Sequence, residues 1–112
     1  MKIMSFVWTS EEKKCLSKVL LDIMNADGFI DEGEANYMNQ LRMVIGISSE
    51  DIVEAHNISV TYSLALLQKM SIEKKIALGV MMANMIDADN DVDDRELKVF
   101  SVVHELIGIP EI

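Results

Sequence analysis

The chain has 112 residues, half of them hydrophobic, a formal net charge of −9 and a single cysteine, Cys15. This length is typical of one domain, and the apolar content is enough for one core without disulfide or metal staples. The negative charge excludes a phosphate-backbone partner, since nucleic-acid affinity comes largely from clustered Lys and Arg, and the lone cysteine excludes an internal disulfide.

Hydrophobic residues at spacings of three and four predict six helices and an all-α fold. In the first helix, Leu16, Leu20 and Ile23 lie on one face, and Thr9 with Glu12 has the pattern of a capping box. No segment alternates convincingly with period two, so no strand is predicted. The predicted helices run from about residue 10 to a first acidic turn, and then over residues 31–45, 48–56, 59–70, 71–87 and 93–107.

An internal repeat organises the chain. A shift of 62 residues aligns residues 22–47 with residues 84–109 without a gap. Each copy reads as a helix, an acidic turn and a second helix that ends at Gly46 or Gly108, because glycine readily adopts the left-handed conformation of a helix end. We therefore expect one domain over residues 1–112, with the repeat at about 10–47 and 71–109.

The turns at residues 25–34 and 87–96 resemble part of an EF-hand calcium loop. With Gly28 or Asn90 at the sixth position, carboxylates fall at the fifth, ninth and twelfth, and a hard cation such as Ca²⁺ or Mg²⁺ prefers such oxygen ligands. Ile23 and Met85 occupy the first position, so we expect no regular EF-hand, and any site must use another geometry or water. The candidate ligands are Asp27, Asp31, Glu34, Asp87, Asp89, Asp91, Asp93 and Glu96.

Helix capping is the competing interpretation of the same acids. Asp31 with Glu34, and Asp93 with Glu96, have the capping-box pattern, in which the Asp accepts from one backbone amide and the Glu reaches back to another. Capping does not explain the surplus of acid at residues 87–96, where Arg95 is the single opposing charge. Such self-repulsion costs stability unless solvent, salt or a bound cation screens it. Both interpretations stay open on the sequence.

The paired turns resemble the mark of the TerB-like family, the helical domains related to tellurite-resistance proteins. That mark is an Ala-Asp-Gly turn followed by a glutamate; here it reads Ala-Asp-Gly at 26–28 with Glu34, and Ala-Asp-Asn at 88–90 with Glu96. The resemblance covers nearly the whole chain. It implies a cytoplasmic, bacterial-type helical domain linked to stress or membrane-associated complexes, and a divalent-metal site made from the acidic turns. It does not imply an enzyme.

No residue pattern points to catalysis or to membrane insertion. His56 and His104 lie outside any zinc or di-iron spacing, and Cys15 has no motif partner. Core packing explains the methionines at residues 81–85 better than soft-metal binding does. Residues 1–9 lack a signal-peptide core, and the longest apolar run, 76–86, is shorter than the roughly 20 residues of a membrane span. We predict a cytoplasmic, non-enzymatic protein.

Two functions compete. The first is a cation-responsive binding module whose acidic turns hold Ca²⁺ or Mg²⁺, in the stress or tellurite-resistance context that the resemblance implies. The alternative is a metal-independent interaction scaffold, whose acidic surface meets a protein partner with a basic surface. Neither function involves nucleic acid or a membrane span.

Overall fold

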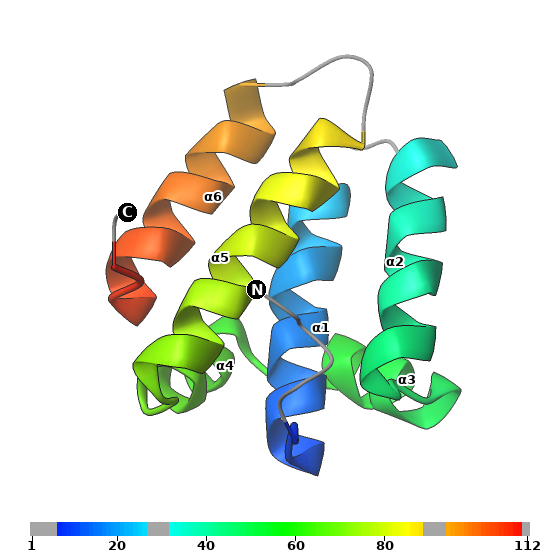
Figure 1. The fold of residues 1–112 in the computed structure, drawn as a ribbon, viewed down its shortest axis with the longest axis horizontal. Helices are drawn as coiled ribbons and strands as arrows, with labels where there is room; N and C mark the ends of the chain where they lie inside the picture. Colours follow the sequence, from blue (N-terminus) through cyan, green and yellow to red (C-terminus); the bar gives the residue numbers. More distant parts are fainter. Residues whose placement is uncertain (1–6, 27–31, 89–93, 111–112) are drawn as a thin grey trace.

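The computed structural model describes residues 7–26, 32–88 and 94–110, and these contain six α-helices and no strand (Figure 1). The predicted all-α class is therefore confirmed, and the predicted helix boundaries are close to the observed ones. The helices are α1 (Ser10–Met24), α2 (Glu32–Ile45), α3 (Ser49–Asn57), α4 (Val60–Gln68), α5 (Ile72–Asp87) and α6 (Asp94–Ile107).

The first helix, α1, lies at the centre of the fold and contacts each of the other five helices. It begins with the predicted capping box: the Glu12 amide donates to Thr9 Oγ1 at 3.1 Å, and the Thr9 amide donates to Glu12 Oε1 at 2.9 Å. Leu16, Leu20 and Ile23 are fully buried on it. The apolar face predicted for this helix is therefore buried in the core.

The fifth helix, α5, supplies much of the remaining core. Leu78, Met81, Met82 and Met85 are fully buried, which confirms that the methionine-rich segment packs in the core. Gly79 faces the end of α6, where a Cβ on this residue would lie 3.2 Å from Ile109 Cγ2. The small residue therefore allows close approach of the two segments.

Two equivalent glycines end α2 and α6. Gly46 and Gly108 have φ angles of 84° and 78°, the left-handed conformation predicted for both. The Ile109 amide donates to the His104 carbonyl at 3.0 Å and the Gly108 amide to the Glu105 carbonyl at 3.2 Å. This pattern is a Schellman motif, and the isoleucine that follows each glycine is buried.

Three residues with helical hydrophobic spacing lie outside the core. Val44, Tyr62 and Leu106 are exposed, although their neighbours in the same stripes are buried. Tyr62 has a polar contact instead, since its hydroxyl donates to Glu11 Oε2 at 2.9 Å. None of the helices in the described ranges is both long and apolar enough to cross a membrane.

Candidate functional site

Three of the eight predicted ligands lie in the described residues. Glu34 and Glu96 stand in the first turns of α2 and α6, and Asp87 is the last residue of α5. Because a helix N-terminus carries partial positive charge, a carboxylate is electrostatically suited to both first turns. The other five candidates, Asp27, Asp31, Asp89, Asp91 and Asp93, lie outside the described residues.

The two glutamates share an unusual environment. Glu34 is 1% exposed and Glu96 is 0% exposed, whereas Asp87 is on the surface. Glutamate is almost never fully buried unless it is paired. The 62-residue offset relates these two residues, so both copies of the repeat place a carboxylate inside the molecule at the same point of the second helix.

Glu96 is the sharper case, because both of its carboxylate oxygens are buried and neither accepts a hydrogen bond from a described residue. Removing an ionised carboxylate from water without a partner costs several kcal/mol or more. A cation that contacts these oxygens would offset this cost. The position has the chemistry of a hard-cation ligand, in keeping with the expected twelfth loop position.

The predicted capping boxes would pair Glu34 and Glu96 with the residues three positions before them. Asp31 and Asp93, the two predicted N-cap residues, lie outside the described residues. Glu96 accepts no hydrogen bond from a described residue, and the Asp93 amide that would donate to it in a capping box is among the residues not described. By contrast, the same pattern at Thr9 and Glu12 is fully formed.

The described residues do not by themselves complete a metal site. Residues 7–26, 32–88 and 94–110 contain no group of three or more His, Cys, Asp or Glu side chains that could hold a metal ion. Glu34, Asp87 and Glu96 are therefore not brought together as one ligand set. Any complete set would require the acids at residues 27–31 or 89–93.

A second pair of equivalent residues was missed by the sequence analysis. A Cβ on Gly46 would lie 3.6 Å from Lys13 Nζ, and one on Gly108 would lie 3.9 Å from Lys75 Nζ. The two lysines are again 62 residues apart. Each ammonium thus lies beside the end of α2 or α6, where it complements the helix dipole. Extending the repeat alignment upstream of residue 22 would have found this pair.

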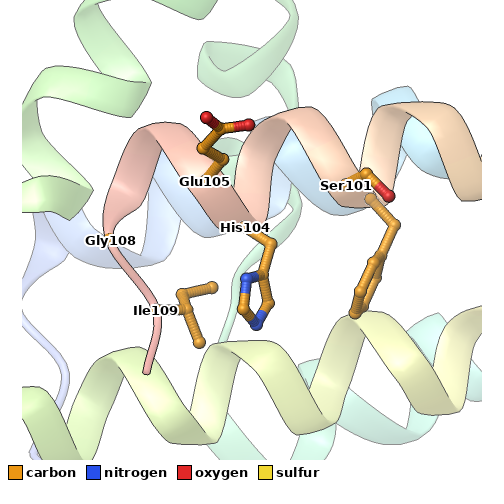
Figure 2. Close-up of a pocket in the computed structure, with 6 residues that line it drawn as sticks. Ser101, His104, Glu105, Gly108 and Ile109 are labelled. Carbon is orange, nitrogen blue, oxygen red and sulfur yellow. The ribbon is translucent and has the colours of Figure 1, made fainter. Parts of the chain in front are cut away.

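A surface pocket of about 460 Å³ beside α6 contains His104 (Figure 2). The imidazole points toward α5 and stacks on Phe100, with 5.6 Å between the ring centroids, while Glu105 projects from the other side of α6. Neither Ser101 nor Glu105 hydrogen-bonds the imidazole. The pocket therefore lacks the nucleophile and base contact that acyl-transfer chemistry requires.

Cys15 is also unsuited to nucleophilic chemistry. Its side chain is fully buried in α1. Burial raises the pKa of the thiol, with a smaller opposing effect from a hydrogen bond with Ser63. Since the thiolate is the reactive form, a buried thiol with a raised pKa is expected to be inert.

Comparison with known proteins bears on the fold. No protein-family model matches the chain, and no curated protein matches it. Among solved structures, it is similar to a protein of unknown function from Porphyromonas gingivalis W83, with a TM-score of 0.80 and 23% sequence identity. The match covers 96% of this chain and 90% of that one. The likeness concerns the fold alone.

Proposed function

We propose that this protein is a non-enzymatic, TerB-like, cation-responsive binding module that holds Ca²⁺ or Mg²⁺ at its second acidic turn. The observation that carries the proposal is Glu96, fully buried with both carboxylate oxygens lacking a hydrogen bond from any described residue. The acids at 87–93 would supply further oxygen ligands. We also propose that the module acts in a stress or tellurite-resistance context. Binding would act by stabilising the folded turn and helix.

The second turn is expected to bind more strongly than the first. Asp87 and Asp91 stand where the first turn has Asn25 and Phe29, so the second turn offers more carboxylates. Met85 occupies the position of the first ligand of a regular loop, so the affinity should be modest, with a dissociation constant of roughly 10⁻⁴ to 10⁻³ M.

Thermal unfolding of chelator-treated protein tests the proposal. A free ion concentration ten times the dissociation constant should add about 1.4 kcal/mol of stability, which corresponds to several degrees in Tm. The variant Glu96→Gln combined with Asp89→Asn should abolish this rise. Glu105→Gln, which removes an exposed charge from the same helix, should retain it.

Sodium chloride at matched ionic strength separates binding from screening. If it raises the Tm as much as CaCl₂ or MgCl₂ does, the cation proposal fails. The metal-independent scaffold then takes its place. The formal net charge of −9 is the observation that favours this alternative. Under it, the acidic surface would bind a basic protein with or without chelator.

A further inference from the structure

A groove of about 400 Å³ runs between α4 and α6, across the side of α1. Val60 and Leu64 of α4 form one wall, Val99 and Val102 of α6 form the other, and the buried Val19 of α1 forms the floor. We refer to it as the α4–α6 groove. It is separate from the acidic-turn glutamates and from the His104 pocket.

The walls of the α4–α6 groove are apolar and partly exposed. Val60 is 42% exposed and Val102 is 49% exposed, and Leu106, one turn further along α6, is 51% exposed. Small-molecule pockets usually bury 70–90% of their ligand, which an open groove cannot do. A bulkier occupant would cover both walls at once, and contiguous exposed apolar surface of this kind is typical of protein contacts.

The spacing of the wall residues suits a helix. Val99 and Val102 form an i, i+3 pair on α6, which the exposed Leu106 continues at i+7 beyond the groove lining, and Val60 and Leu64 form an i, i+4 pair on α4. A helix packs its own side chains into the space between two such ridges. Helix-in-groove recognition uses three or four apolar anchors with this periodicity.

Two exposed cations line one end of the groove. Arg95 and Lys98 line it near the start of α6, at the end of the molecule where α1 finishes (Figure 1). Asp22 also lines this end, but Lys18 Nζ lies 3.8 Å from its Oδ1. Lys98 forms no ion pair with the described residues. On a chain of net charge −9, an exposed cation beside an apolar groove favours an acidic group.

We infer that the α4–α6 groove binds an amphipathic helix of a different protein, with apolar anchors at i, i+4 and i+7 and an acidic side chain beside Lys98. A second copy of this chain is disfavoured, because two molecules of charge −9 repel each other. The inference goes beyond the proposed cation site and requires no metal.

Three synthetic peptides test this inference by fluorescence anisotropy in the presence of chelator. Each is a helix of about 14 residues, or four turns, with Leu at i, i+4 and i+7, and they differ in carrying Glu, Gln or Lys at the end that would face Lys98. The wild-type protein should bind the Glu peptide most tightly. Val102→Asp should abolish binding of all three peptides.

Two further variants make the test specific. Leu97→Asp, at a 43% exposed position that does not line the groove, should leave binding unchanged. Lys98→Glu should weaken binding of the Glu peptide about threefold to fivefold and reverse the ranking of the Glu and Lys peptides. Circular dichroism should show that each variant is folded.

Several results would overturn the inference. One is the absence of binding by all three peptides up to about 1 mM, and another is an equal loss of binding in the Leu97→Asp control. Tighter binding of decanoate than of the Glu peptide would identify the groove as a small-amphiphile site instead. Self-association in sedimentation experiments that Val102→Asp abolishes would identify a second copy as its occupant.

Discussion

At the scale of single residues, Glu96 combines two properties that rarely coincide. It is fully buried, and its carboxylate oxygens accept no hydrogen bond from the described residues. Residues that serve only stability are normally satisfied by their surroundings. Within the described residues, the carboxylate of Glu96 therefore lacks the hydrogen bonds that a buried polar group normally has.

Replacement of Glu96 by leucine should stabilise the metal-free protein. Exchange of buried charge for apolar volume is often neutral or stabilising by about 1 to 4 kcal/mol. Urea denaturation in chelator measures this directly, and addition of CaCl₂ should no longer stabilise the variant. A large loss of stability in chelator would instead assign Glu96 a structural role.

Glu12 shows how a compensated carboxylate behaves in the same molecule. Burial acts to raise its pKa, but hydrogen bonds from the Lys74 ammonium, at 2.7 Å, and from the Thr9 amide outweigh burial and lower the pKa below 4.5. The lowered pKa means that the ionised form stabilises the fold above pH 4.5. This contribution is lost as pH falls through the lowered folded-state pKa.

Acidification should therefore separate wild type from Glu12→Gln. Between about pH 5 and pH 3, the Tm of wild type should fall more steeply than that of the variant. Glu73→Gln, which removes an exposed first-turn glutamate from α5, should follow the wild-type curve. Parallel curves for wild type and Glu12→Gln would show that the Lys74 contact does not contribute to stability.

At the scale of helices, local sequence signals predicted where most helices begin and end, but not which residues of each hydrophobic stripe are buried. Ser48, Ser59 and Ser71 each accept a hydrogen bond from a first-turn amide, and Gly46 and Gly108 close α2 and α6, because these features depend on nearby residues alone. Helical periodicity defines a stripe, but the rotation of that stripe toward its neighbours depends on tertiary packing. The exposed residues of the stripes therefore could not be identified from spacing.

The helix ends allow a direct test. At Gly108, the positive φ angle of 78° disfavours any residue with a Cβ, so Gly108→Ala should cost about 1 kcal/mol. Gly108→Asn should cost less, since asparagine tolerates this conformation. The denaturation midpoint should be highest for wild type, lower for Gly108→Asn and lowest for Gly108→Ala. A Gly108→Ala variant as stable as wild type would contradict the assigned conformation.

At the scale of the whole molecule, the repeat could be predicted from the sequence, but the burial of its residues could not. Identities 62 residues apart predicted two equivalent acidic turns, and the described parts add equivalent buried glutamates, helix-ending glycines and lysines. Burial of Glu34 and Glu96 could not be inferred, because both capping and metal binding are compatible with a surface carboxylate. The α4–α6 groove likewise depends on how segments distant in sequence are placed.

The core should dominate the stability of this fold. Leu78 is fully buried on α5, so Leu78→Ala should cost about 2 to 5 kcal/mol through lost transfer energy and a residual cavity. Ile72→Ala, at an exposed position at the start of the same helix, should change stability by no more than about 0.5 kcal/mol. Guanidinium unfolding of the two variants provides the comparison, and similar costs would contradict the placement of α5.

The buried methionines can report transient opening of the fold, because an oxidant reaches them only in the open form. Met81, Met82 and Met85 are sealed from solvent, whereas Met43 on α2 is 85% exposed. Peroxide converts an accessible thioether to a polar sulfoxide, which a packed interior cannot accommodate. Met43 should therefore be oxidised at close to the rate of a free side chain, and the interior thioethers at that rate multiplied by the fraction of molecules that is transiently open. Peptide mass spectrometry over time would measure the ratio of the two rates, and hence the population of the open form, with Met43 as the internal reference.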